Sequence, residues 1–220
     1  ASAVQAGAPE QGKIDPVKAQ ADATREAWKR SPDKPIAATL PLYDRVMAFQ
    51  LIRNFIPAHQ AKSDTNFIVE FLPDGENFDN WSRMITVTSE KGGANGQMPH
   101  AALAKMLFDS KRGCDKNPFY KQIAERKLGD GVSAIILSRG CGQVAANAYP
   151  GALAMGEQNL IIHLRDAQNS YTIQYAVRGF FDGGQPPFAV QDVEKQLARL
   201  SPIKLCPANR NCDAILKLTP

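Results

Sequence analysis

The side chains best suited to covalent chemistry are four cysteines: Cys114, Cys141, Cys206 and Cys212. None of them forms a C-x-x-C, so the spacing supports neither a zinc knuckle nor a thioredoxin-type redox pair. Four cysteines allow three pairings. The short Pro- and Asn-rich segment 207–211 can bring its two flanking cysteines within disulfide distance, which leaves the other two as the second pair. We therefore expect bonds 114–141 and 206–212, and four free thiols are the alternative.

Three histidines, His59, His100 and His163, are the candidates for metal ligation or proton transfer. No two of them lie two to four positions apart, so a zinc site of the H-E-x-x-H type is excluded. His163 lies in an apolar run, where we expect a half-buried structural imidazole. His100 follows a proline at an expected helix start, where we expect it in solvent. Clustering of either histidine with an acid and a serine would instead indicate a hydrolase.

Motifs for other chemistry are missing from the sequence. There is no G-x-S-x-G, no Walker A motif and no strand-linked G-x-G-x-x-G, and the glycine-rich segment 91–97 is typical of a mobile loop. Asp74 and Glu76 fall in an expected turn, with no apolar run beside them to raise a carboxyl pKa for acid catalysis. We therefore expect no catalytic residue, no cofactor site and no metal site.

Candidate contacts with a partner are five aromatic residues: Trp28, Tyr149, Phe180, Phe181 and Phe188. All but the first lie in or beside loops that are rich in glycine and proline, a composition typical of protein-contact surfaces. The alternative is that these rings only anchor their loops. Trp28 lies in an expected N-terminal helix that has a thin apolar stripe, so it is a candidate anchor for a docking arm.

The composition limits the class of protein. The chain has 220 residues, of which 44% are hydrophobic and 22% charged, and this is typical of one soluble globular domain. Its 26 basic and 22 acidic residues are interspersed, so we expect no nucleic-acid partner. The longest aliphatic run, 134–137, is far too short to span a bilayer, which leaves only peripheral membrane contact. The oligomeric state is left open.

The expected compartment is outside the cytosol. The first eight residues are mostly small, as is common just after a removed signal peptide. Disulfides persist in oxidising compartments. We therefore expect a periplasmic or secreted protein.

Hydrophobic periodicity predicts an α+β chain. The expected helices are 16–30, 99–110, 117–128 and 188–200. The expected strands are 46–51, 66–72, 82–88, 132–139, 159–165 and 171–178, of which the last three form an antiparallel meander. We expect residues 1–40 to form a flexible arm with a short helix, and residues 41–220 to form a single α/β domain that ends in a disulfide-bonded tail.

Two segments carry a family resemblance. One is Phe49-Gln50-Leu51 followed by Phe55-Ile56-Pro57, and the other is the run Glu-Phe-Leu-Pro-Asp-Gly-Glu-Asn-Phe-Asp-Asn-Trp-Ser-Arg-Met-Ile-Thr-Val at 70–87. Together they resemble the PsbP-like superfamily, which includes the extrinsic protein of photosystem II and DcrB-type bacterial envelope proteins. The resemblance covers 45–200 in element order. It implies an antiparallel sheet of about six strands sandwiched between helices.

The resemblance also implies a role in binding or assisting other proteins. Our leading hypothesis is a non-enzymatic exported protein, an accessory subunit that binds or helps assemble a protein complex of the cell envelope. The alternative is a carrier that binds a small molecule or lipid in a pocket between sheet and helices. A hydrolase comes third. Residues 1–40 and the tail from Cys206 have no counterpart in the resemblance.

Overall fold

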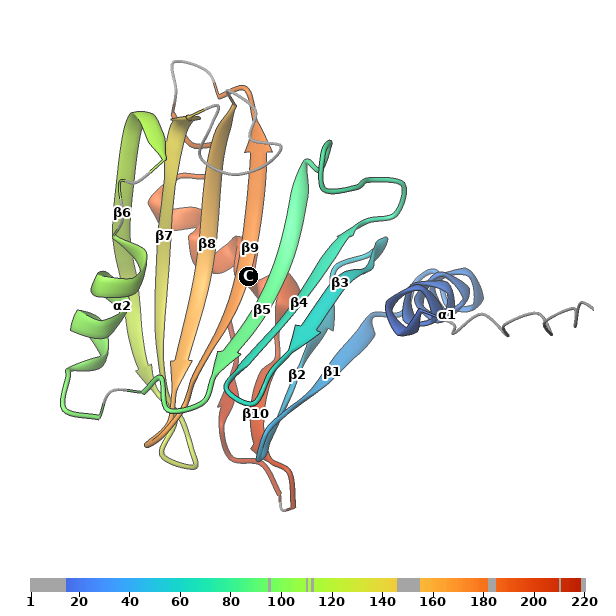
Figure 1. The fold of residues 1–220 in the computed structure, drawn as a ribbon, viewed down its shortest axis with the longest axis horizontal. Coiled ribbons are helices and arrows are strands. Elements are labelled where there is room, and N and C mark those ends of the chain that lie inside the picture. The colour runs from blue at the N-terminus through green and yellow to red at the C-terminus, as the bar shows by residue number, and fades with distance from the viewer. Residues whose placement is uncertain are drawn as a thin grey trace, which may run out of the picture.

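A computed structural model describes residues 15–94, 96–109, 111, 113–145, 155–181, 185–209 and 211–218. These residues form two antiparallel sheets and three α-helices (Figure 1). None of the described helices has both the length and the apolar character needed to cross a bilayer.

The large sheet has seven strands, and every neighbouring pair is antiparallel. Across the sheet the order is β3 (Phe55–Lys62), β4 (Asn66–Pro73), β5 (Arg83–Glu90), β9 (Ser170–Gly179), β8 (Gly156–Arg165), β7 (Ser133–Val144) and β6 (Cys114–Lys127). The expected meander of the last three predicted strands is present as β7, β8 and β9. Successive side chains of each strand alternate between two faces.

The inner face of the large sheet, as we call it, carries the main core. Along β4, the inner residues are Phe67, Val69 and Phe71, and all three are buried. The small sheet closes over this face with β1 (Ile36–Leu42), β2 (Arg45–Leu51), β10 (Ile203–Pro207) and β11 (Ile215–Leu216), in that order. Helix α3 (Val193–Leu197) packs into the same core, between two short 3-10 helices, η2 (Val190–Asp192) and η3 (Ala198–Leu200).

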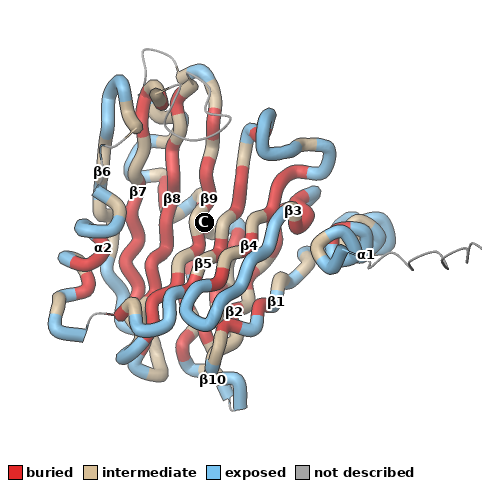
Figure 2. Tube along the Cα trace, viewed as in Figure 1, coloured by how far each residue is buried: buried red, intermediate tan, exposed pale blue. Residues whose placement is uncertain are grey.

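The outer face, as we call the other side, is covered only in part. Helix α2 (His100–Phe108) contacts it over β7, where Ala104 packs against Ile135, Leu137 and Ile161. Figure 1 shows α2 in front of the large sheet and the C-terminal helical segment behind it. In Figure 2, β7, β8 and β9 are largely buried, whereas the far end of β3 is exposed.

Helix α1 (Pro16–Arg30) has the bounds and the cap that the sequence predicts. The Asp15 side chain accepts a hydrogen bond from the Val17 N–H at 2.9 Å, and proline occupies the first turn. The helix contacts β3, and the Trp28 Nε1–H donates to the Phe55 carbonyl oxygen at 3.2 Å. The expected boundary between residues 40 and 41 falls within β1, and an independent arm over residues 1–40 stays a prediction.

The helix expected at 117–128 is wrong, because these residues lie mostly in the edge strand β6. That strand pairs with β7 along its whole length. Apolar residues are sparse in this segment, so neither a helical stripe nor a strand alternation is clear, and pairing with β7 decides the outcome. Pro118 is compatible with an edge strand, because proline has no backbone N–H to donate and an edge strand pairs on one side alone.

The expected sheet between helices needs a second correction. The inner face is covered by the small sheet as well as by α3, and the large sheet has seven strands instead of six. The sequence did not predict strands β1, β3, β10 and β11. These strands are short or begin beside a proline-rich or turn segment, so they have weak alternation of their own.

Both expected disulfides are confirmed. Cys114–Cys141 links the edge strand β6 to β7, with 5.6 Å between Cα atoms. Cys206–Cys212 closes a loop at the end of β10, with 4.7 Å between Cα atoms. No cysteine is free.

Candidate functional site

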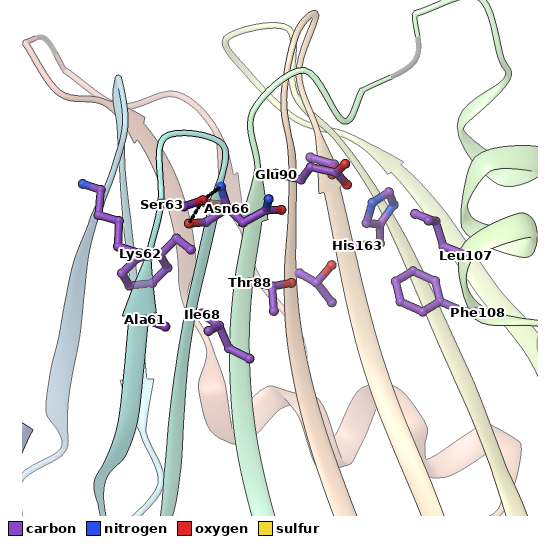
Figure 3. A pocket seen from close by; sticks show the side chains of 14 residues that line it. Ala61, Lys62, Ser63, Asn66, Ile68, Thr88, Glu90, Leu107, Phe108 and His163 are labelled. Carbon is purple, nitrogen blue, oxygen red and sulfur yellow. Dashed lines mark hydrogen bonds between the residues drawn. The ribbon is translucent and has the colours of Figure 1, made fainter. Parts of the chain in front are cut away.

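A groove of about 500 Å³ lies on the outer face, between the end of α2 and the β3–β4 hairpin (Figure 3). Its floor is one row of directly paired side chains from five neighbouring strands: Ala61, Ile68, Thr88, Thr172 and His163. Neighbouring strands lie about 4.8 Å apart, so the row extends about 19 Å from β3 to β8.

The walls of the groove differ from end to end. Beside His163 stand Leu107 and Phe108, the last two residues of α2 (Figure 3). At the other end stand Lys62, Ser63 and Asn66 of the β3–β4 hairpin, and the next row of the sheet adds Glu90 and Ser170. The lining is more apolar than polar. The groove therefore suits a ligand whose body is apolar and which makes few hydrogen bonds.

Two histidines and a serine form a hydrogen-bonded chain beneath the α2 end of the groove. The His100 Nε2 and His163 Nδ1 atoms lie 2.9 Å apart, and the His100 Nδ1 and Ser133 Oγ atoms lie 2.7 Å apart. His100 is 4% exposed and His163 is 1% exposed. The Phe108 ring packs edge to face against the His163 ring, with centroids 5.5 Å apart.

The fold holds this chain from two sides. His163 lies in the middle of the sheet, paired with Ile135 on β7 and Thr172 on β9. His100 begins α2, and the segment before α2 is tied to β8 because the Arg165 Nη1 donates to the Met98 carbonyl at 2.6 Å and to the Ala94 carbonyl at 3.3 Å. The start of α2 is thereby fixed above β8.

Both imidazoles are neutral near pH 7. Burial lowers the pKa of His100 to about 4, with a smaller contribution from the positive charge of Arg165. Burial also lowers the pKa of His163 to about 3, and His100 and Arg165 contribute in the same direction.

One nitrogen atom in this hydrogen-bonded chain of side chains has no hydrogen-bond partner. The Nε2 atom of His163 is buried and makes no hydrogen bond with any residue that the structure describes. Leaving a buried polar group unpaired costs about 1–3 kcal/mol, and native proteins rarely do so. This atom belongs to a residue that lines the groove, so a ligand that displaces the neighbouring side chains could bind it.

The expectation that His100 lies in solvent is wrong, because α2 folds onto the outer face and buries its first residue. His163 is buried more fully than expected. The third histidine, His59, is exposed on β3 and lies beside the Phe78 ring. Sequence spacing did not indicate the His100–His163 pair, since the two residues are 63 positions apart. The only available signal was a lone histidine inside an apolar strand.

A hydrolase would need a histidine together with a serine and an acid, and the cluster of His100, His163 and Ser133 has only the first two. Ser133 is present, but no carboxylate hydrogen-bonds to either histidine within the described ranges. Nor do those ranges contain a group of three or more His, Cys, Asp or Glu residues that could hold a metal ion.

The structure separates the predicted partner contacts. Phe180 is 88% exposed, just after β9. The Phe181 ring covers Gly156 at the start of β8, and Phe188 is held by two hydrogen bonds between its backbone and the Gln158 side chain. Trp28 docks α1 on β3, as described above, and Tyr149 lies outside the described residues.

No protein-family model and no curated protein matches this chain. Among solved structures, it is similar to the Ran-binding protein Mog1p of Saccharomyces cerevisiae, with 12% identity, a TM-score of 0.38, and coverage of 77% of this chain and 86% of that one. A mutant of Mog1 gives 13% identity, a TM-score of 0.37, and coverage of 75% and 85%. At this level of identity and TM-score, the similarity carries no information on function.

Proposed function

We propose that this protein is a non-enzymatic binding protein, and that the outer-face groove binds a small molecule with a mainly apolar body. The observation that carries the proposal is the buried, unpaired His163 Nε2 at the floor of an apolar groove. Most buried polar atoms have partners, and ligand sites combine an apolar lining with a few directed polar groups. The carrier role that the sequence offered as its alternative is therefore preferred to the leading hypothesis.

Binding without catalysis agrees with the electrostatics of the cluster. A general base works best with a pKa near the working pH, whereas the pKa of His100, the partner of Ser133, is about 4. A serine beside so weak a base is poorly activated at pH 7. The cluster is better suited to hydrogen bonding than to proton abstraction.

We further propose that the protein works in an oxidising compartment, as a periplasmic or secreted protein. Two disulfides support this, because cytosolic reductants keep such pairs reduced. The resemblance to PsbP-like proteins, which include envelope proteins, agrees with the same assignment.

The groove can be tested with N-phenyl-1-naphthylamine, a dye that fluoresces when it enters apolar surroundings. Thr88→Phe places a ring in the middle of the floor row, while Thr86→Phe is the matched control. Both threonines are half-buried on the outer face of β5, but Thr86 pairs with Glu70 and Gln174, one row outside the groove. We expect Thr88→Phe to weaken dye binding roughly tenfold or more and Thr86→Phe to leave it unchanged.

Equal binding by both variants would contradict the groove as the binding site. So would the absence of dye binding to the wild-type protein at concentrations up to its solubility. Circular dichroism of both variants checks that each retains the β-sheet signal.

A second candidate function, binding a protein partner, is favoured by Phe180. An aromatic ring exposed by 88% is the type of anchor that protein interfaces bury. A photo-crosslinking residue, p-benzoylphenylalanine, at position 180 is expected to form an adduct with an envelope protein in its native host. The control places it at Phe78, which is 43% exposed on the β4–β5 connection. Equal or absent adducts at the two positions would contradict this function.

A further inference from the structure

We infer that the groove selects ligands with one uncharged hydroxyl head group, which hydrogen-bonds to His163 Nε2 while the apolar body lies along the floor row. The inference rests on the proposed function, since it names the class of ligand for the same groove. It follows from the hydrogen-bonding states of the histidine chain and from the charges around the groove.

The histidine chain has two complete arrangements when both rings are neutral. In one, the Ser133 hydroxyl donates to His100 Nδ1, His100 Nε2–H donates to His163 Nδ1, and His163 offers an Nε2–H donor to the groove. In the other, every bond is reversed, and His163 Nε2 offers a bare acceptor. All internal partners are satisfied in both, and only the outermost atom changes its role.

A hydroxyl group suits both arrangements. It can accept from an Nε2–H or donate to a bare Nε2, because it carries one proton and two lone pairs. A carbonyl can only accept, so it fits one arrangement alone. The hydroxyl is therefore the head group that binds without forcing the chain into a single state.

The charges around the groove disfavour an ionic head. Among the described residues, no lysine or arginine side chain lines the His163 end, although the charge of Arg165 reaches His163, and the one described lining cation, Lys62, points away from His163 at the β3 end (Figure 3). Glu90 in the next row is exposed, so solvent weakens both its repulsion of an anion and its attraction for a cationic head. An ion held against the buried imidazole would lose its hydration without a matched partner.

Access to Nε2 requires a side-chain movement. The atom exposes almost no surface, and the neighbouring wall is formed by Leu107 and Phe108. Leu107 is 39% exposed, so its rotation displaces little packing. The head group enters by displacing the end of this wall, while the side chains of Thr172, Thr88 and Ile68 contact the body.

Four probes of nearly equal size test the head group at pH 7: 2-naphthol, naphthalene, 2-naphthoate and 2-naphthylmethylamine, which is cationic at this pH. We expect 2-naphthol to bind roughly three- to tenfold more tightly than naphthalene, the gain of one net hydrogen bond. We expect both ionic probes to bind more weakly than 2-naphthol. His163→Phe should remove the preference for 2-naphthol and keep naphthalene binding.

A measurement without mutation keeps the inference testable if His163→Phe does not fold. The imidazole ¹⁵N resonances of His163 in the wild-type protein report the state of Nε2. We expect the Nε2 resonance to move when 2-naphthol is added and to stay nearly unchanged with naphthalene.

The outcomes separate this inference from the proposed function. If naphthalene and 2-naphthol bind equally and Thr88→Phe blocks both, the groove binds ligands but the hydroxyl selection is wrong. Tightest binding by either ionic probe also overturns the selection. If no probe binds the wild-type protein, the proposed function itself fails.

Discussion

The two faces of the large sheet are built from alternate residues of the same strands, yet they differ in how they are covered. The inner face is apolar and enclosed by the small sheet and α3. The outer face is covered by α2 near β7 and by Trp81 over Leu72, Met84 and Ala176, and the rest of it carries threonines, a glutamate and a groove. One strand thus supplies core residues and binding residues in alternation.

Buried polar groups occur on both faces. On the inner side, the Gln158 side chain donates to Ser138 Oγ and to the Phe188 carbonyl and accepts from the Phe188 N–H. On the outer side, the hydrogen-bonded histidines end in His163 Nε2, which has no partner among the described residues. Ser89 Oγ, on the inner side, is also buried without a partner, so unpaired buried atoms are not confined to the outer face.

The largest expected effect is the truncation of a ring on the inner side. Phe49 is 1% exposed and contacts the Phe71 ring edge to face at 6.1 Å. We expect Phe49→Ala to lower the free energy of unfolding by about 3–5 kcal/mol, measured by urea denaturation. Ile68→Ala on the outer face should lower it by less than about 1.5 kcal/mol, because that side chain is half-buried, while weakening dye binding. An equal loss of stability from both would contradict the contrast between the faces.

The edge strand β6 is held by a disulfide bond, and we expect this bond to supply stability that buried side chains supply elsewhere in the sheet. No residue of β6 is fully buried on either face. The Cys114–Cys141 bond closes a separation of 27 residues, against 6 for Cys206–Cys212. We expect replacing the first pair by alanines to lower the free energy of unfolding by about 3–4 kcal/mol, and replacing the second pair to lower it by about 2 kcal/mol. A larger effect of the second pair in urea denaturation would contradict this order.

Local signals in the sequence were enough to predict part of the fold. The Asp15 cap and Pro16 fix the start of α1, and the period-two pattern of β4 identifies its inner residues. The disulfide pairing followed from the short segment between Cys206 and Cys212. In each case the residues that decide the structure are close together in the chain.

The predictions that failed concern residues whose structure depends on segments far away in the chain. Residues 117–127 form a strand because β7 is available to pair with them, and nothing within the segment itself specifies that partner. The site depends on α2 docking on the outer face, which brings His100 onto His163 across 63 positions. No pattern within either segment encodes that contact.

The histidine pair predicts a loss of stability in acid. In the unfolded chain the two histidines bind protons below about pH 6.5. In the folded protein burial lowers the two pKa values to about 4 and about 3. The unfolded state therefore takes up protons first as pH falls, so the stability is present above about pH 6.5 and declines from there to about pH 3. We expect a loss on the order of 4 kcal/mol between pH 7 and pH 5, measured by urea denaturation.

Two variants isolate the contribution of the pair. The double change His100→Gln and His163→Gln should flatten the decline, while His59→Gln, at an exposed position, should leave most of it in place. Glu70 acts in the opposite direction, because burial on the outer face raises its pKa and its folded form binds a proton first. That contribution is common to the wild-type protein and the double variant and cancels between them, whereas His59→Gln removes the charge that lowers the Glu70 pKa and so strengthens the Glu70 contribution. An unchanged slope in the double variant would contradict the assignment.

The smallest expected effect compares two serines of β7, one for each face. Ser133→Ala removes the outer partner of His100 Nδ1 and leaves that buried atom unpaired, so we expect a loss of about 1 kcal/mol in urea denaturation. Ser138→Ala on the inner side should lose less, because Gln158 Nε2 keeps its bond to the Phe188 carbonyl at 3.1 Å. The preference for 2-naphthol should persist in Ser133→Ala, since a hydroxyl fits either state of His163. Loss of that preference would contradict the inference that a hydroxyl binds either hydrogen-bonding state of His163.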